Sequence, residues 1–425
     1  MHTDLQSCTF PIADLSGLKK KVLKWLRPFS TFCFLDNQQY HTASHEAECL
    51  VGAGVREWVQ TASVSDADVF FQKEHWLFGH LSYDLKESLH GLPNTKEDKV
   101  GFSPYCFFSP QIVLQLKQGC LTIYADEPEQ VFTQLNAQPD EAGTVILPFF
   151  QISPVLSREA YIQKIRALQA HILRGDCYEI NFCQAFFAEE ISLDPFAVFR
   201  NLMAVSPNPF SAFYRQEDKY LICASPERFL ARRGNRLLSQ PIKGTIKRDL
   251  GNEQQDQQLR DSLRLSAKEQ SENVMVVDLV RNDLTRVCKP ATVKVDELFG
   301  IYSFPQVHQM ISTISGEIKD DVSFSEILQA TFPMGSMTGA PKLRVMQLID
   351  AYEPTTRGIF SGSVGYKAPG GNFDFNVVIR SILYDQTSRY LSYQVGSGIT
   401  FYCNAEQEWE ECMLKAEAIK KVLSV

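Results

Sequence analysis

The segment Pro-Ile-Lys-Gly-Thr at residues 241–245 predicts a strand that ends at a reaction centre. Gly244 would let a ligand approach the backbone closely, because glycine carries no side chain. Sixteen residues before Lys243, Glu227 lies in the segment Ser-Pro-Glu-Arg-Phe at 225–229 and could supply a proton. We therefore predict Lys243 and Glu227 as the catalytic pair, although such a lysine, judged from these residues alone, is more often solvated or ion-paired.

The bulk composition is that of an ordinary globular protein. Its 425 residues are enough for two or three domains, or for one large unit that mixes helices and strands. Hydrophobic residues make up 44% and charged residues 22%, which predicts a large core and argues against disorder. The net charge of −8 argues against binding to nucleic acid or to an anionic membrane, because both need a concentrated positive field.

Location and cysteine chemistry follow from patterns that the sequence lacks. No apolar run reaches the roughly 18 residues of a membrane span, and no secretory signal pattern opens the chain, so we expect a cytoplasmic protein. The 11 cysteines include no Cys-x-x-Cys pair, which argues against a structural zinc site and a disulfide framework. Buried free thiols are the better interpretation.

Periodicity and turn composition predict several local elements. Residues 157–174 carry apolar side chains at helical spacing, with Ser157 suited to begin the helix and Gly175 suited to follow its end. The apolar stretches 107–116 and 120–124 predict two strands, joined by the turn Lys-Gln-Gly. We therefore expect antiparallel sheet in the first third of the chain.

Two pairs of glutamates share the spacing i, i+3: Glu269 with Glu272, and Glu408 with Glu411. On a helix this spacing puts both carboxylates on one face, and two such faces could surround a hard cation with oxygen ligands. Mg²⁺ would suit that site. An apolar stripe runs beside Glu408, Glu411 and Lys415, so this acidic line would border the core. Solvated helix faces are the alternative, and the spacing alone favours them.

Two further stretches could bind carboxylates. Arg380 ends the strand-like stretch 375–379, where its guanidinium could hold a carboxylate through two hydrogen bonds, although a structural ion pair is equally consistent. Gly396, Ser397 and Gly398 follow a predicted strand and could present backbone amides to a second carboxylate. A bulge or a turn at the strand end is the more common interpretation of such glycines.

Separated segments of the chain resemble, in the same order, those of the chorismate-utilising enzymes. They are Gly-Asp-x-Tyr-x-x-Asn at 175–181, Ser-Pro-Glu-Arg-Phe at 225–229, Pro-Ile-Lys-Gly-Thr at 241–245, Glu-Asn-Val-Met-Val-Val-Asp-Leu-Val-Arg-Asn-Asp at 272–283 and Glu-x-x-Glu-x-x-x-Lys at 408–415. Within this family the chain resembles the branch that makes aminodeoxychorismate. Related anthranilate synthases carry alanine where Lys243 stands.

The resemblance implies an α+β fold of two large packed antiparallel β-sheets with helices outside. Residues 1–150 would form the N-terminal region of this fold and residues 151–425 its chorismate-binding catalytic region, together one structural unit. The implied Mg²⁺ ligands are Glu272 and Glu411 directly, and Glu269 and Glu408 through water. The implied substrate-binding residues are Gly244, Thr245, Arg380, Gly396, Ser397, Gly398 and Lys415.

The reaction that the resemblance implies is the amination of chorismate to 4-amino-4-deoxychorismate, on the route to p-aminobenzoate and folate. Glu227 would protonate the departing C4 hydroxyl while Lys243 adds at C2, and ammonia would then attack C4 and expel the lysine. Lys243 must be neutral to attack, so we expect a pKa lowered by burial or by nearby positive charge. The sequence has no Gly-x-Cys-x-Gly glutaminase motif, so a separate glutamine amidotransferase subunit would supply the ammonia.

Two other functions stay open. Anthranilate or isochorismate synthesis would share the metal and carboxylate sites but would not use Lys243 as a nucleophile. An inactive chorismate-binding subunit is the second alternative, because Gln309 stands where several relatives have a histidine and Phe360 replaces a tyrosine of anthranilate synthases. Retention of the catalytic pair and of the metal-binding glutamates argues against an inactive subunit.

Overall fold

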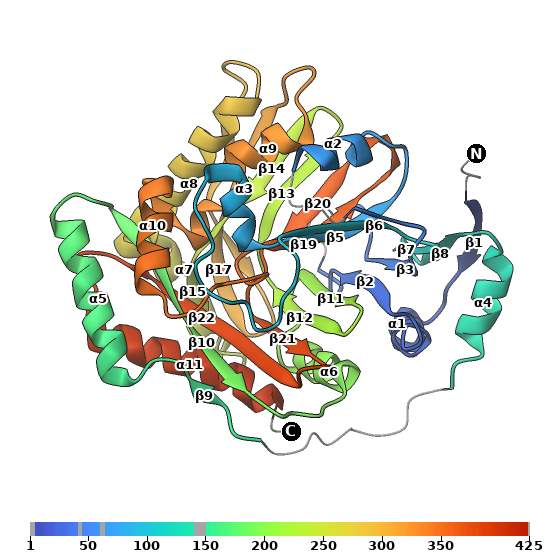
Figure 1. The fold of residues 1–425 in the computed structure, drawn as a ribbon, viewed down its shortest axis with the longest axis horizontal. Helices are drawn as coiled ribbons and strands as arrows, with labels where there is room; N and C mark the ends of the chain where they lie inside the picture. The colour runs from blue at the N-terminus through green and yellow to red at the C-terminus, as the bar shows by residue number, and fades with distance from the viewer. Residues whose placement is uncertain (1–4, 41–44, 60–63, 140–149, 424–425) are drawn as a thin grey trace.

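A computed structural model describes residues 5–40, 45–59, 64–139 and 150–423, in which two antiparallel β-sheets pack together with helices outside (Figure 1). This arrangement confirms the predicted α+β fold. The first sheet contains, in spatial order, β1 (Gln6–Pro11), β8 (Cys120–Ala125), β7 (Ile112–Lys117), β3 (Cys49–Ala53), β2 (Thr31–Asp36), β11 (Phe210–Gln216), β12 (Lys219–Ser225), β21 (Ser381–Asp385), β22 (Tyr390–Ile399), β10 (Glu179–Ala188) and β18 (Gly339–Ala340), with β9 (Ser153–Pro154) beside β10.

The second sheet is also antiparallel throughout. Its strands, in spatial order, are β15 (Ile242–Lys247), β17 (Val307–Glu317), β14 (Arg236–Gln240), β13 (Arg228–Arg233), β20 (Phe373–Asn376), β19 (Ser363–Lys367), β5 (Leu77–Leu81), β6 (Tyr105–Ser109) and β4 (Glu57–Val59), with β16 (Lys294–Ser303) beside β17. Strands from both halves of the chain enter each sheet: β2 pairs with β11, and β5 pairs with β19.

Alternation along the strands explains why the first sheet is apolar on both faces. In β2, Phe32 and Phe34 point to one face and pack against helix residues, whereas Cys33 points to the other face and packs with residues of the second sheet. In β10, Phe182 and Cys183 divide in the same way. Because neighbouring side chains of a strand point to opposite faces, one continuous apolar run serves two cores.

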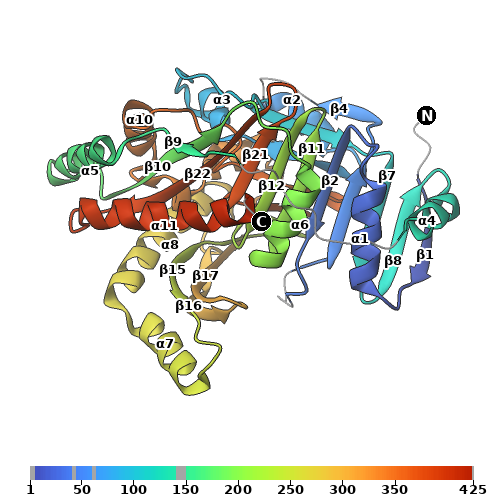
Figure 2. The same cartoon turned by 90° about the horizontal axis from the view of Figure 1, so that it is seen from below.

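Helices cover the outer faces of the two sheets (Figure 2). Those that share a core with the first sheet are α1 (Leu15–Trp25), α4 (Pro128–Asn136), α5 (Arg158–Leu173), α6 (Pro195–Val205), α10 (Lys342–Tyr352) and α11 (Ala405–Leu423). On the second sheet, α8 (Ala267–Val287) packs on β15 and β17, and α9 (Phe324–Thr331) packs on α8. The other helices are α2 (Ser65–Phe71), α3 (Lys86–His90), α7 (Glu253–Leu265) and the short 3-10 helices η1 (Tyr83–Leu85), η2 (Gly335–Met337) and η3 (Pro369–Gly371). None of the helices in the described part of the chain is long and apolar enough to span a membrane.

The helix and hairpin predictions are confirmed, but four strand boundaries are wrong. Lys243 lies near the start of β15, Arg380 lies beyond the end of β20, and residues 396–398 lie within β22 because its pairing with β10 continues through them. The Ser157 side chain accepts a hydrogen bond from the amide of Ala160 at the start of α5, and Gly175 follows its end with a φ of 84°. The stretch 107–116 is not one strand, because it divides between β6 and β7, which belong to different sheets. Pro110 separates them, and proline has no N–H to donate to a sheet ladder. The 11 cysteines are free, and most are buried.

A buried ion pair ties β10 to the segment that follows α10. Arg357 donates to both carboxylate oxygens of Glu353, at 2.6 and 2.9 Å, and these side chains are 1% and 2% exposed. Arg357 also donates to the carbonyls of Asn181 and Met337, and Glu353 accepts from the amide of Cys183. Each charged group therefore has several partners, which buried charges need in order to be tolerated.

We predict that replacing Arg357 with methionine destabilises the fold strongly, because the Glu353 carboxylate would stay buried without its cation. Breaking one side of a buried pair costs about 3–5 kcal/mol, and urea unfolding followed by circular dichroism would measure this loss. The control is Arg166→Met, which breaks an exposed pair with Glu406 at 2.7 Å and should change the unfolding free energy by less than about 1 kcal/mol. Equal effects of the two substitutions would contradict the prediction.

Candidate active site

Lys243 and Glu179 meet where the edge of the second sheet approaches β10, the strand next to the edge strand β18 of the first sheet. Lys243 lies in β15 at the edge of the second sheet, and Glu179 begins β10 of the first sheet. The Lys243 Nζ donates a hydrogen bond to Glu179 Oε1 at 2.5 Å, and the two side chains are 12% and 5% exposed. A buried ion pair therefore joins the sheets at the residue that the sequence predicts as the nucleophile.

The glycine at position 398 leaves room for this ion pair. Gly398 lies in β22, opposite Asn181 of β10. A Cβ atom at Gly398 would lie 2.6 Å from Glu179 Oε1 and 3.0 Å from Lys243 Nζ. Any side chain there would displace one or both partners, so Gly398 belongs to the site through its lack of a side chain as well as through its backbone.

The charge state of Lys243 differs from the sequence-based expectation. Burial alone would lower its pKa, but the Glu179 carboxylate, with smaller contributions from Glu272 and Glu227, raises the pKa above its ordinary value. The predicted lowering of this pKa is therefore wrong for the protein without ligands. The physical reason is Glu179, which sequence analysis did not identify as a partner. In the resting protein Lys243 carries its proton, and attack requires an acceptor for it.

Glu227 lies between β12 and β13 and is 4% exposed. Burial raises the pKa of its carboxyl group to about 7, against the opposing effects of Ser336, Lys243 and Arg380. Within the described ranges it forms no ion pair. At pH 7 a substantial fraction of this carboxyl group is therefore still protonated, whereas an ordinary glutamate would be almost fully ionised, and a general acid needs that proton.

The two glutamates of α8 face the same region. The Glu269 side chain lies beside Gly244, since a Cβ atom on that glycine would be 3.0 Å from Glu269 Oε2. Burial raises the pKa of Glu272, the charges of Glu179 and Glu269 raise it further, and Lys243 opposes them. Negative charge is thus concentrated here, and a cation near Glu272 would relieve the repulsion.

The glutamates of α11 approach from the first sheet. Glu411 pairs with Lys415 at 2.7 Å, and Lys415 Nζ also donates to the carbonyl of Gly396 at 3.1 Å. Burial alone would raise the pKa of Glu411, but Lys415 and, among other cations, Lys243 hold it below its ordinary value. Burial raises the pKa of Glu408, and the Glu411 charge adds to that effect. The i, i+3 pairs of α8 and α11 therefore belong to one electrostatic neighbourhood around Lys243.

These carboxylates fit Mg²⁺ by chemistry and charge. All four donors are carboxylate oxygens, which hard cations prefer, and Glu408 Oε2 is buried with no hydrogen-bond partner in the described ranges. As the side chains stand, however, no three His, Cys, Asp or Glu residues of the described chain converge closely enough to hold a metal. Glu411 is held by Lys415 instead. Coordination by Glu272 and Glu411 stays a prediction.

Polar groups without partners point to where a ligand could bind. Among the described residues, the Arg380 guanidinium makes no hydrogen bond or ion pair, and Ser397 Oγ is buried without a partner. Burial lowers the pKa of Arg380, and Glu227 opposes this effect. Gln309 donates to Thr245 Oγ1 at 3.5 Å, while its own Oε1 is buried and unpartnered. Arg380 and Ser397 could therefore donate to ligand oxygens, and Gln309 could accept.

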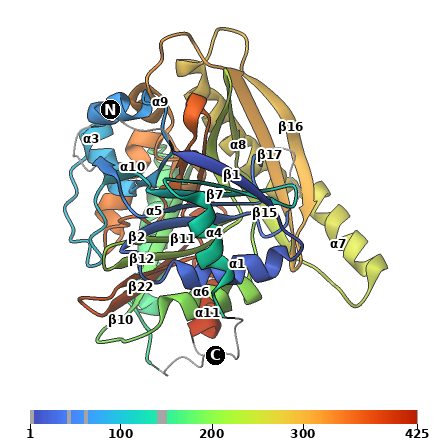
Figure 3. The same cartoon turned by 90° about the vertical axis from the view of Figure 1, so that its right-hand side faces the viewer.

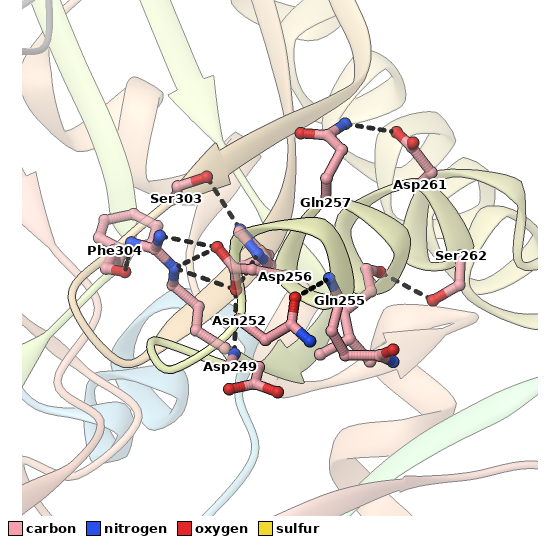
Figure 4. Close-up of polar contacts among 12 residues, drawn as sticks. Asp249, Asn252, Gln255, Asp256, Gln257, Asp261, Ser262, Ser303 and Phe304 are labelled. Carbon is pink, nitrogen blue, oxygen red and sulfur yellow. Dashed lines mark hydrogen bonds and ion pairs between the residues drawn. The ribbon is translucent and has the colours of Figure 1, made fainter.

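The helix α7 connects the strand that carries Lys243 to the helix that carries Glu272, and it projects from the body of the protein (Figure 3). Its N-terminal end is held by Asp256, which accepts from Arg248 at 2.7 Å and from the amide of Asp249 at 3.0 Å (Figure 4). His308 Nε2 lies 3.0 Å from the same carboxylate, and Asn252 caps the helix. This anchor fixes the chain between two parts of the site.

The pattern of the chorismate binding enzymes matches residues 22–421. The chain belongs to this family. Aminodeoxychorismate synthase component 1 of Salmonella typhimurium is 40% identical over 357 residues, which cover 83% of this chain and 77% of that protein. The anthranilate synthase component I-like protein of Synechocystis is 32% identical over 354 residues, which cover 82% and 72%. The menaquinone-specific isochorismate synthase of Escherichia coli has the same fold, with a TM-score of 0.78 at 19% identity over 100% of this chain and 96% of that chain.

In this chorismate-binding enzyme, Glu179 is the site residue that sequence analysis missed, although it lies in the segment 175–181. A glutamate that opens an apolar strand is itself a signal, because a buried carboxylate needs a cationic partner. The partner could not be identified from local sequence, since Lys243 is 64 positions away.

We predict that Gly398→Ala reduces kcat at least about tenfold, because the new methyl group would push Lys243 and Glu179 apart by distances that matter for proton transfer. Both displaced groups are ends of flexible side chains, so the fold should persist, and circular dichroism would verify this. Gly251→Ala is the matched control, since a Cβ atom there meets only Asp249 Oδ1 at 3.5 Å. A wild-type kcat in the Gly398 variant would show that the position of Lys243 against Glu179 does not limit the rate.

Proposed function

We propose that this chorismate-binding enzyme is the synthase component of an aminodeoxychorismate synthase, which aminates chorismate to 4-amino-4-deoxychorismate. The observation that carries the proposal is the buried Lys243 in contact with a carboxylate and near Glu227, whose pKa burial raises to about 7. Relatives named aminodeoxychorismate synthase component 1, with identities up to 40%, support it. A cytoplasmic location and a place in p-aminobenzoate and folate synthesis are part of the same proposal.

Chorismate has two carboxylates, and the site offers two regions to hold them. Arg380 and the backbone amides of Gly396 to Gly398 would bind the enolpyruvyl carboxylate, with Gly244 and Thr245 beside the ring. Glu272 and Glu411 would hold Mg²⁺, assisted through water by Glu269 and Glu408, and the bound cation would supply positive charge for the ring carboxylate.

With chorismate fixed in this way, Glu227 would protonate the C4 hydroxyl as it leaves, while Lys243 forms a bond to C2. Ammonia would then attack C4 and expel the lysine. The component 1 relatives imply a second component, and we propose a glutamine amidotransferase subunit as the source of ammonia.

Anthranilate synthesis is the second candidate, because a relative at 32% identity carries the name anthranilate synthase component I-like protein. Lys243 favours the first candidate, since a covalent route needs a nucleophile at this place. Product analysis separates the two: purified chain with chorismate, Mg²⁺ and ammonia should yield 4-amino-4-deoxychorismate, and glutamine should not replace ammonia. Anthranilate or isochorismate as the product would overturn the proposal.

We predict that chorismate and Mg²⁺ without ammonia leave a covalent adduct on the peptide that contains Lys243, visible by mass spectrometry. Lys243→Ala should lose the adduct and show its main defect in kcat, because the carboxylate contacts remain. The control is Lys247→Ala, which removes an exposed lysine from the same strand and should behave as wild type. An unaltered rate in the Lys243 variant would favour direct attack by ammonia.

We predict that kcat/KM falls as the pH rises through about 7, since burial sets the Glu227 pKa of the protein without substrate near that value and the acid form is required. Below this pH the carboxyl group is protonated and kcat/KM is high, and above it kcat/KM should drop about tenfold per pH unit. Glu227→Gln should lower kcat/KM about 100-fold or more and remove this descending limb. A Gln variant that keeps the limb would show that another group causes it.

A further inference from the structure

The ion pair between Glu179 and Lys243 has a chemical role to play, because a protonated lysine cannot attack. We propose that Glu179 is the base that takes the proton from Lys243 as its amine attacks chorismate, and that returns the proton when the lysine leaves. This inference rests on the proposed function and deepens it by naming a further catalytic residue of the same site.

The geometry favours Glu179 over the other acidic residues nearby. Its Oε1 lies 2.5 Å from Lys243 Nζ, and among the described residues no other carboxylate comes within 4 Å of that nitrogen. Glu272 has Lys268 at 3.9 Å instead, and burial raises the pKa of Glu227, which makes its site less favourable for a negative charge than that of an ordinary glutamate. Among the carboxylates that the structure describes, Glu179 is therefore the one in contact with Lys243.

The strand register holds Glu179 in this place. Residues 179, 181 and 183 share the face of β10 that is turned to the second sheet, while Ile180 and Phe182 pack on the helix side. Gly398 leaves the space that the two partners occupy, since a Cβ atom there would lie 2.6 Å from Glu179 Oε1 and 3.0 Å from Lys243 Nζ. A base must lie within hydrogen-bond distance of the proton it removes, and this one does.

The proton balance closes over one turnover. Glu179 takes a proton from the Lys243 ammonium, the free amine forms a bond to C2, and the C4 hydroxyl leaves as water with the proton of Glu227. When ammonia forms a bond to C4, the bond from C2 to lysine breaks and its electron pair returns to the lysine nitrogen. The new C4 ammonium gives a proton to Glu227, and Glu179 returns its proton to Lys243.

Burial makes the transfer within the pair easier than it would be in water. An ion pair in a buried site pays for desolvation of both charges, whereas a neutral amine beside a neutral carboxylic acid does not. The charged groups that face the pair are Glu227 from the loop before β13, Glu272 from α8 and Glu411 from α11. They act on the charge of Lys243 without contacting its amine.

The test uses Glu179→Gln, which keeps the size of the side chain and an oxygen for the hydrogen bond but cannot accept the proton. Wild type and variant are mixed with chorismate and Mg²⁺ without ammonia, quenched at intervals, and the Lys243 peptide is weighed by mass spectrometry. We expect the variant to form the adduct about 100-fold more slowly at pH 6.5. The ratio of the two rates should shrink as the pH rises, because solvent then removes the lysine proton.

The protonation state of Glu227 affects wild type and the Glu179→Gln variant alike, so its effect cancels in the ratio of their adduct-formation rates. Glu179→Asp should recover part of the rate, because it restores a carboxylate. Glu190→Gln makes the same exchange at an exposed residue just after β10 and should leave the rate unchanged.

Three results would overturn the inference. The first is a Glu179→Gln variant that forms the adduct as fast as wild type or faster. The second is a ratio of the two adduct-formation rates that stays constant with pH, and the third is a Glu179→Asp variant that forms the adduct no faster than Glu179→Gln. The constant ratio would mean that Glu179 only positions the lysine. If wild type itself forms no adduct, the covalent route and this inference fail together, whereas an adduct in wild type with any of the three results removes this inference alone.

Discussion

The buried ion pair of Glu353 and Arg357 fixes the position of β10, and the position of β10 decides what the site contains. Arg357 donates to the carbonyl of Asn181, and Glu353 accepts from the amide of Cys183, so both bonds act just after Glu179. A shift of β10 by one residue would turn Glu179 toward the helices, because alternate residues of a strand face opposite sides. Together with the ladder between β10 and β22, this ion pair holds the strand register that places Glu179 against Lys243.

Local sequence predicts the elements well where one periodicity extends over many residues. The helix α5 shows its apolar spacing and its caps, and the structure confirms both. The two-sheet architecture came from resemblance of the motifs, because the order of strands in a sheet depends on contacts far apart in sequence. For the same reason the stretch 107–116 was assigned to one strand: apolar patterning cannot show that the chain changes sheets at Pro110.

The sequence predicts most residues of the candidate site, but it does not predict which of them contact one another. Glu227, Lys243 and the acidic residues of α8 and α11 stand in recognisable segments, and the structure brings them into one electrostatic neighbourhood. Glu179 was missed, and with it the sign of the Lys243 pKa shift, because that sign depends on which charge lies in contact. Burial alone would have lowered this pKa, and a single carboxylate from the other sheet reverses the outcome.

Two glutamates near Lys243 show how environment divides one residue type between two tasks. Glu227 is buried without an ion pair in the described ranges, and burial raises its pKa to about 7, so that it retains a proton at higher pH than an ordinary glutamate. Glu179 lies against the Lys243 ammonium, whose charge stabilises a carboxylate. A reaction that expels a hydroxyl and uses an amine as nucleophile needs one group that gives a proton and one that takes it. Because both residues are glutamates, their type cannot tell the acid from the base. In the proposed reaction, contact with Lys243 makes Glu179 the base and leaves Glu227 as the acid.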